Sequence, residues 1–124
     1  MTYCFDLDGV ICEDLLMDSV WGKECSEWDS MRWIRYYNEV GPNEDIIEKM
    51  SELKKSGHIV IIYTARSSLH KEITQKWLAK HNVPYNQLVL DKPKACLYID
   101  DRAANYQIGD SVKELFEKAK ILSN

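Results

Sequence analysis

Short continuous runs of apolar residues recur along the chain, and each is bounded by polar or turn-forming residues. Runs of this length predict strands, here at residues 2–6, 59–63, 87–90 and 96–99. Ile59–Tyr63 is apolar at every position and rich in β-branched residues, which is typical of a strand buried on both faces. The same interpretation applies to Cys96–Ile99.

Between these runs the apolar residues fall at helical spacing. One predicted helix begins near Asn43 and ends before Gly57, with an apolar face made by Ile46, Ile47, Met50 and Leu53. A second ends near His81–Asn82 and is expected to bury Leu69, Ile73 and Trp77. The last opens at Ser111, where Glu114 completes a capping box, and its inward side chains are Val112, Leu115, Phe116 and Ala119.

Strands that alternate with helices predict an α/β fold of three layers, a Rossmann-like parallel sheet with helices on both faces. The 124 residues are expected to form one domain, residues 1–124. The stretch from about 13 to 42 is irregular and carries three of the four tryptophans. We interpret it as a short flap inserted after the first strand, with Ser26 and Asp29 capping a short helix through Tyr37.

Composition excludes several classes of partner. The net charge of −4 offers no basic surface for nucleic acid, and no apolar run approaches the length that spans a membrane. Asp6 lies too close to the start for a signal peptide to precede it. The four cysteines lack a C-x-x-C spacing, so we expect reduced thiols in a cytoplasmic protein.

Polar side chains follow the predicted strands at the points where they end. They are Asp6 and Asp8, then Thr64 and Arg66 with Ala65 between them, then Lys92 in a loop, then Asp100 and Asp101. Parallel strands present their carboxyl ends at one edge, so these groups are expected to gather in one crevice. Clustered carboxylates repel each other unless a cation is present, and oxygen ligands suit Mg²⁺. A hydroxyl, an ammonium and a metal ion around one point predict a phosphate site.

The order and spacing of these residues resemble the haloacid dehalogenase-like phosphatase superfamily. The shared pattern is D-x-D-G-V, a hydrophobic strand ending in Thr, a Lys, and a hydrophobic strand ending in Asp-Asp, from Phe5 to Asp101. FDLDGVICED, IVIIYTAR, the Lys-Pro pair and LYIDDRA further resemble small phosphatases of bacterial surface-polysaccharide biosynthesis. The resemblance implies a minimal-cap enzyme that uses Mg²⁺ to hydrolyse a small phosphorylated metabolite, such as a sugar, polyol or amino-alcohol phosphate.

The resemblance also implies a role for each residue. Asp6 would attack phosphorus and form an aspartyl-phosphate, while Asp8 would protonate the leaving oxygen and then activate water. Mg²⁺ would be held by Asp6, Asp8, Asp100 and Asp101, with Asp100 as the favoured direct ligand of the last two. The phosphate would be bound by Thr64, Ala65, Arg66 and Lys92.

Several alternatives stay open on sequence grounds. Lys94 competes with Lys92 as the phosphate lysine, and Arg66 could bind phosphate or pair with a motif carboxylate. A nucleoside monophosphate phosphatase and a catalytically silent binding module on the same fold are the rival functions. A response-regulator receiver domain is rejected because Asp100 and Asp101 follow Lys92 instead of preceding it. A flap this short leaves an open site that a neighbouring subunit of a homo-oligomer could close.

Overall fold

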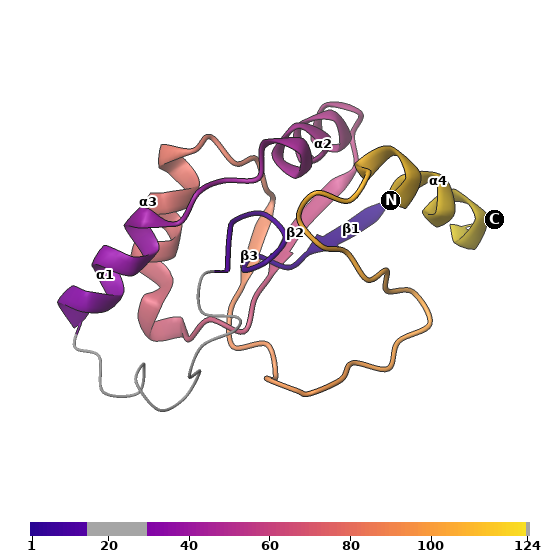
Figure 1. Ribbon diagram of the computed structural model, residues 1–124. Coiled ribbons are helices and arrows are strands. Elements are labelled where there is room, and N and C mark those ends of the chain that lie inside the picture. Colours follow the sequence, from indigo (N-terminus) through magenta and orange to yellow (C-terminus); the bar gives the residue numbers. More distant parts are fainter. Residues whose placement is uncertain (15–29, 124) are drawn as a thin grey trace.

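The computed structural model describes residues 1–14 and 30–123, and a parallel sheet lies at its centre (Figure 1). The strands follow the order β1, β2, β3, with bounds Thr2–Phe5, Ile59–Tyr63 and Gln87–Val89. Tyr3 of β1 lies opposite Val60 of β2, the central strand. Because the strands are parallel, their carboxyl ends meet at one edge of the sheet. The predicted parallel α/β sheet is confirmed for these strands.

The helices of the described residues are α1, α2, α3 and α4, with bounds Ser30–Glu39, Glu44–Lys55, Lys71–Lys80 and Val112–Ser123. A single turn of 3-10 helix, η2 (Ser68–His70), directly precedes α3. None of the described helices has both the length and the apolar character needed to cross a membrane. The helix through Tyr37 is present as α1, whereas its predicted caps, Ser26 and Asp29, lie outside the described residues.

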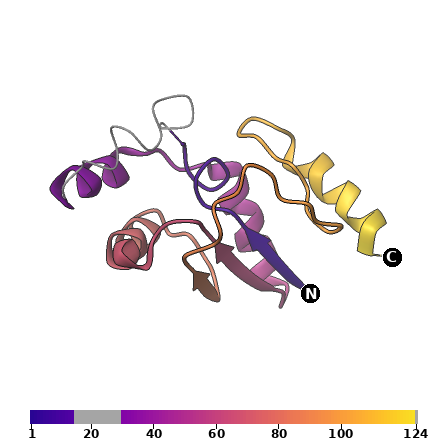
Figure 2. The same ribbon diagram turned by 90° about the horizontal axis from the view of Figure 1, so that it is seen from below.

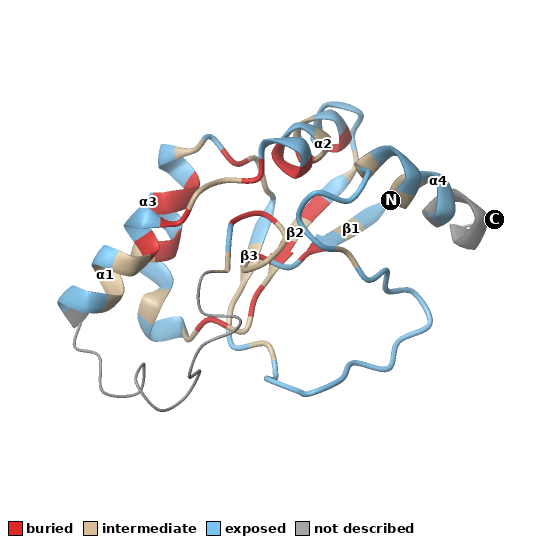
Figure 3. Ribbon diagram, in the orientation of Figure 1, coloured by how far each residue is buried: buried red, intermediate tan, exposed pale blue. Residues whose placement is uncertain are grey.

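One face of the sheet carries the core. Val60 and Ile62 of β2 belong to one buried cluster with Met50 of α2 and Leu78 of α3 (Figure 3). Phe116 of α4 extends this layer and lies near Phe5 of β1, with ring centroids 6.3 Å apart. Figure 2 shows α4 beside α2 at the β1 side of the sheet. Helices and sheet are therefore joined through one apolar layer.

The opposite face of the sheet is more open than the sequence predicts. Alternate residues of β2 are buried, whereas Ile59 is 49% exposed and Cys4 of β1 is also exposed. The prediction that Ile59–Tyr63 is buried on both faces is wrong, because Ile59 is exposed and alternate residues are only half-buried. Helices on both faces of the sheet stay a prediction. An unbroken apolar run satisfies one-sided burial too, because every second side chain still enters the core.

Residues 91–111, which we call the strap, contain the largest departure from prediction. Cys96–Ile99 is not a strand here, and Leu97 and Ile99 are 72% and 93% exposed. Between its two ends the strap lies away from the sheet (Figure 1). Within the strap, the Tyr98 hydroxyl donates to the Pro93 carbonyl. A continuous apolar run predicts a strand only if a neighbouring strand supplies its ladder.

Asn43 fixes the end of the strap against the start of α2. The predicted start of this helix at Asn43 is confirmed, although the side chain does not cap it. The Asn43 amide instead donates to the Val10 carbonyl and to the Tyr106 hydroxyl, both at 2.9 Å. Gly57 follows the helix with φ of +87°, the left-handed conformation expected after a helix end.

The buried face of α3 agrees with the predicted one only in part. Trp77 is buried as predicted, together with Thr74 and Leu78. Ile73 is half-buried, whereas Leu69 lies in η2 and is 89% exposed. The Ser67 hydroxyl accepts the Leu69 backbone N–H at 3.1 Å and starts η2. The α-helix itself begins only at Lys71. Leu69 therefore precedes α3 and does not share the helical spacing that predicted its burial.

Two leucine-to-alanine substitutions test this face. Leu78→Ala should lower the free energy of unfolding by about 2–5 kcal/mol, because it opens a cavity in the core. Leu69→Ala should change it by less than about 0.5 kcal/mol, because that side chain is exposed. Urea denaturation followed by tryptophan fluorescence measures both. Similar losses for the two variants would contradict the observed face.

Candidate active site at the carboxyl edge of the sheet

A tight turn after β1 sets the positions of the two motif aspartates. The Leu7 carbonyl accepts backbone N–H groups from Val10, Ile11 and Cys12 at 3.2, 2.9 and 3.1 Å. Gly9 has φ of +86°, a conformation that a side chain would strain. Leu7 itself is fully buried and anchors this turn. Asp6 and Asp8, on either side of it, lie beyond the end of β1, at the carboxyl edge of the sheet.

Asp8 forms an ion pair with Arg66, which follows β2. Arg66 Nη2 donates to Asp8 Oδ1 at 2.7 Å, and Nε donates to Asp8 Oδ2 at 3.0 Å. Arg66 is only 5% exposed, whereas the Asp8 side chain keeps 25% of its surface accessible. Of the two roles that the sequence left open for Arg66, the structure places it on a motif carboxylate.

The Arg66 guanidinium has further partners from three directions. Its Nη1 donates to Thr74 Oγ1 of α3 at 3.2 Å, and its Nη2 lies 3.7 Å from Cys12 Sγ. The Tyr37 ring of α1 covers it, with the Arg66 Cζ atom 3.9 Å from the ring centroid. Burial alone lowers the pKa of Arg66, but the hydrogen-bonded Asp8 carboxylate outweighs burial and holds that pKa above its ordinary value.

Asp6 has a different environment from Asp8. Its Oδ1 accepts the Leu7 backbone N–H at 2.8 Å, and part of the residue reaches solvent. Burial is the largest influence and raises the pKa of the Asp6 carboxyl, and Asp8 and Asp14 raise it further by repulsion. The Leu7 N–H and the Lys92 ammonium partly offset these effects. Asp6 is thus the less firmly paired carboxylate of the two.

Thr64 and Lys92 lie at the same edge. Thr64 is 1% exposed, and its hydroxyl accepts the Arg66 backbone N–H at 3.2 Å. The Lys92 backbone N–H donates to the Thr64 carbonyl at 3.0 Å. Ala65, between Thr64 and Arg66, is half-buried. The phosphate-binding roles assigned to these residues from the sequence stay predictions.

The two candidate lysines act on different groups. The Lys92 ammonium lies 4.4 Å from the Tyr98 ring centroid and 5.2 Å from that of Tyr63, and its charge acts on Asp6. Lys94 instead helps to lower the pKa of His70, after burial and Arg66. Lys92 is therefore among the charges that act on Asp6.

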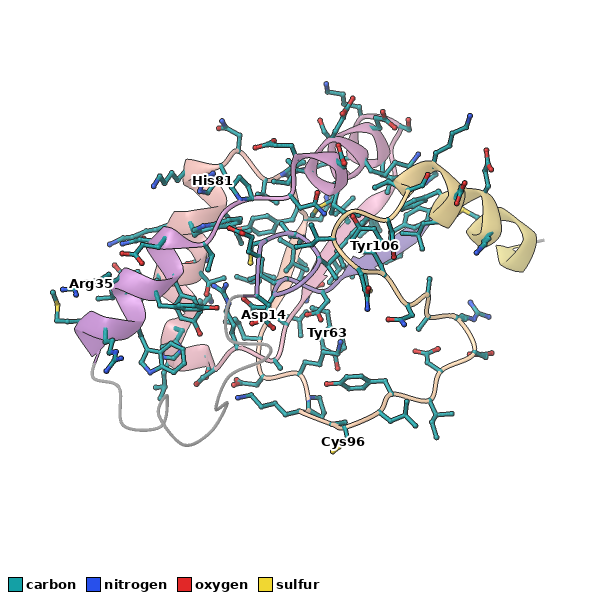
Figure 4. All side chains as sticks on the ribbon, in the orientation of Figure 1. Asp14, Arg35, Tyr63, His81, Cys96 and Tyr106 are labelled. Carbon is teal, nitrogen blue, oxygen red and sulfur yellow. The ribbon has the colours of Figure 1, made fainter. Side chains whose placement is uncertain are left out.

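Asp100 and Asp101 are not brought to this edge. Both are exposed on the strap, where Asp100 Oδ1 accepts the Arg102 backbone N–H at 2.8 Å. In Figure 4 Cys96 marks the outer side of the strap, away from Asp14 and Tyr63. Across residues 1–14 and 30–123, no three His, Cys, Asp or Glu side chains are grouped so that they could hold a metal ion. As placed, these side chains do not fit Mg²⁺, and the predicted metal site stays a prediction.

Sequence reasoning missed Tyr37 and Thr74 as partners of the site. From the sequence, Tyr37 only marks the end of the short helix predicted in the flap, and Thr74 has no predicted role. A signal for Thr74 exists, because it is a polar residue that shares the buried face of α3 with Trp77 and Leu78. A buried hydroxyl of this kind needs a hydrogen-bond partner, which Arg66 supplies. Trp21 and Trp28, two of the tryptophans of the predicted flap, lie outside the described residues.

Comparisons with known proteins bear on both fold and chemistry. No protein-family model matches the chain. A protein of Bacillus cereus named "Putative nucleotidase" is 35% identical over 60 residues. The matched stretch covers 48% of this chain and 32% of the relative, so the chain spans about a third of the relative's length.

Solved structures show the same fold. The crystal structure of an MCSG target from Vibrio cholerae has a TM-score of 0.62 and 24% identity, and covers 97% of each chain. A chain of the Pnkp1/Rnl/Hen1 complex has a TM-score of 0.52 and 23% identity, over 82% of this chain and 30% of that one. At these identities the likeness shows the α/β fold alone.

The raised pKa of Asp6 predicts a pH-dependent gain in stability for Asp6→Asn. A carboxyl whose pKa is raised by folding destabilises the fold when it is ionised, and this effect vanishes below its ordinary pKa. Asp6→Asn should therefore be more stable than the wild type at neutral pH, with the gain disappearing as the pH falls into the acid range. Urea denaturation at both pH values measures this. Asp110 is exposed, so Asp110→Asn is the control. A lower free energy of unfolding for Asp6→Asn than for the wild type at neutral pH would contradict the expectation.

Proposed function

We propose that the protein is a haloacid dehalogenase-type phosphatase that hydrolyses a small phosphomonoester through an aspartyl-phosphate at Asp6. The observation that carries this proposal is the contrast between the two motif aspartates. Asp6 reaches solvent within the field of Lys92, whereas Asp8 is fixed by the buried Arg66. The first arrangement suits a nucleophile, and the second fixes the orientation of the residue that we propose to move the proton. The similarity to a protein named as a nucleotidase supports a phosphate ester as substrate.

The reaction divides into two displacements at phosphorus. The Leu7 N–H engages Asp6 Oδ1, which leaves Oδ2 to attack phosphorus while the bond to the leaving oxygen breaks. Asp8, protonated at that stage, gives its proton to the leaving oxygen, so that an alcohol departs and Asp6 carries the phosphoryl group. Asp8 then takes a proton from water as the water attacks phosphorus, which releases phosphate and restores Asp6.

The charges around Asp6 suit the first displacement. Partial burial and the nearby carboxylates raise the pKa of Asp6, which makes its carboxylate a stronger base than that of an aspartate with the ordinary pKa. Lys92 favours the ionised form and is positioned to meet an anionic phosphoryl group. We propose that the hydroxyl of Thr64 and the backbone near Ala65 also contact the phosphate.

The metal requires a different position of the strap. We propose that Asp100 or Asp101 reaches Asp6 when Cys96–Ile99 leaves its exposed position and pairs with the outer edge of β1. Two observations support this: β1 is an edge strand of the described sheet, and Leu97 and Ile99 expose apolar surface. Bound there, Mg²⁺ would supply charge neutralisation for the phosphoryl group.

Two substrate classes are compatible with this chemistry. The resemblance to polysaccharide-biosynthesis phosphatases favours sugar, polyol or amino-alcohol phosphates. The nucleotidase name of the Bacillus cereus protein favours nucleoside monophosphates as the second candidate. A silent binding module would hydrolyse neither class.

A substrate panel together with Asp6→Asn tests the proposed activity. The wild type should release phosphate from at least one class among sugar, polyol, amino-alcohol and nucleoside phosphates. Asp6→Asn should reduce this by about 10³-fold or more, because the amide cannot act as the nucleophile. Asp110→Asn, the same change on an exposed loop, should retain activity. Activity retained by Asp6→Asn would contradict the covalent step, and no hydrolysis of any phosphate would favour the silent module.

The movement of the strap predicts that Mg²⁺ protects Cys96. Cys96 is exposed in the observed position and should react rapidly with iodoacetamide. Pairing of Cys96–Ile99 with β1 would bury this thiol, so Mg²⁺ should slow its alkylation several-fold, as measured by mass spectrometry. EDTA should reverse the protection and abolish phosphatase activity. If alkylation of Cys96 is equally fast with and without Mg²⁺, or if the Asp100→Asn/Asp101→Asn double variant is protected like the wild type, the proposed metal site is wrong.

A further inference from the structure

The guanidinium of Arg66 has all of its nitrogens committed to the protein. Nε and Nη2 donate to Asp8, Nη2 also faces Cys12 Sγ, and Nη1 donates to Thr74. One face of the planar guanidinium is covered by the Tyr37 ring. These partners come from the turn after β1, from α1 and from α3, so separate elements meet on a single side chain.

We propose that Arg66 is a positioning residue for Asp8, held in place by Tyr37 and Thr74, and that it does not bind the substrate phosphate. This assignment rests on the proposed phosphatase function. Arg66 acts through Asp8, which would touch the leaving oxygen, and does not itself contact the reacting atoms.

Burial argues against a direct role on phosphate. Arg66 is 5% exposed, and each of its three nitrogens already donates to Asp8 or Thr74, so a phosphate oxygen would compete with these acceptors. Removing the guanidinium from Asp8 would leave a partly buried carboxylate without its counterion, which is costly. The bidentate geometry also fixes the plane of the carboxylate, which a single ammonium cannot do.

The hydrogen bonds distinguish the two oxygens of Asp8. Oδ1 is contacted by Nη2 at 2.7 Å, by Nε at 3.3 Å and by Cys12 Sγ at 3.6 Å. Oδ2 accepts from Nε at 3.0 Å. Both oxygens are thus held by the guanidinium, and Oδ1 has the larger number of partners.

Tyr37 connects this arrangement to the flap. Its ring lies against the guanidinium and stacks on Trp33 of the same helix, with centroids 5.4 Å apart. The Tyr37 hydroxyl lies 3.4 Å from His70 Nδ1, which ties α1 to the start of α3. The ring, and not the hydroxyl, makes the contact with Arg66. The position of Asp8 should therefore depend on the Tyr37 ring.

The test compares substrates with different leaving groups. The wild type, Arg66→Gln, Arg66→Lys and Asp8→Asn are assayed on aryl and alkyl phosphates, and inhibition by inorganic phosphate is measured for each. If Arg66 positions the proton donor, Arg66→Gln should slow the phosphorylation of Asp6, measured in a single turnover, about 10²-fold for alkyl phosphates, which need protonation of the leaving oxygen. The loss in this step should be at most a few-fold for p-nitrophenyl phosphate, as in Asp8→Asn, whereas hydrolysis of the aspartyl-phosphate, in which Asp8 is the base, should slow equally for all substrates. The Ki of phosphate should stay within about two-fold of the wild type.

A role on phosphate would give the opposite pattern. A Ki for phosphate raised ten-fold or more, with equal losses in the rate of Asp6 phosphorylation on all substrates, would overturn the assignment. Arg66→Lys keeps the charge without the bidentate geometry, so it should show the same leaving-group dependence to a smaller extent. Arg35→Gln, on the exposed side of α1, is the matched arginine control and should retain wild-type kinetics.

A pair of Tyr37 variants separates the ring from the hydroxyl. Tyr37→Phe keeps the ring over Arg66 and should match the wild type within about two-fold on all substrates. Tyr37→Leu removes the ring and should show the leaving-group dependence of Arg66→Lys. Thr74→Val, which removes the acceptor of Nη1, should do the same. Circular dichroism confirms that each variant is folded, and identical kinetics for Tyr37→Leu and Tyr37→Phe would exclude Tyr37 from the positioning group.

An NMR measurement keeps the assignment testable if the protein hydrolyses no phosphate ester. The Arg66 Nε–H should give a resolved signal that exchanges slowly with water, because it is buried and bonded to Asp8. Asp8→Ala should speed this exchange at least ten-fold, and Tyr37→Leu should speed it more than Tyr37→Phe. Equal exchange in the wild type and Asp8→Ala would overturn the positioning role, whereas loss of activity alone would overturn only the proposed function.

Discussion

The ion pair between Arg66 and Asp8 joins the segments from which the candidate site is built. Asp8 belongs to the turn after β1, and Arg66 follows the central strand, so the pair connects two neighbouring strands beyond the end of their ladder. Through Tyr37 and Thr74 the same guanidinium also contacts α1 and α3. An arginine this deeply buried is tolerated because charge, hydrogen bonds and an aromatic face are all satisfied together. Removing any one partner leaves the others in a less favourable environment.

The same pair explains how two neighbouring aspartates acquire different properties. Asp6 and Asp8 are separated by one residue, yet only Asp8 has a bidentate cation. Asp6 lies in the repulsive field of Asp8 and Asp14, which Lys92 relieves only in part. Two carboxylates with unequal environments are the usual basis for dividing nucleophilic and proton-transfer roles between like residues. The asymmetry arises from residues far along the chain, because Arg66 and Lys92 both follow β2.

The sequence predicts the elements better than it predicts their packing. The start of α2 at Asn43 and the left-handed Gly57 after it follow from local rules, as does the parallel pairing of β1, β2 and β3. The burial of Ile59–Tyr63 on one face and the exposure of Leu97 and Ile99 do not, because burial depends on what packs against a run and not on the run itself.

For the site, the pattern identifies Asp6, Asp8, Thr64 and Lys92 at one edge of the sheet. That Arg66 pairs with Asp8 could not be predicted from the sequence, because residues 8, 37, 66 and 74 are adjacent only in the folded chain.

The pairing of β1 with β2 has a consequence for synthesis of the chain on the ribosome. Tyr3 lies opposite Val60, and Phe5 lies opposite Ile62, so β1 has no ladder partner until the chain has been translated as far as β2. Asp6 and Asp8 are made before β2 and Arg66, and their geometry is not defined until those residues follow. Until then β1 is a short apolar segment that a chaperone or another nascent chain can bind. The two aspartates are thus made before the residues that organise them.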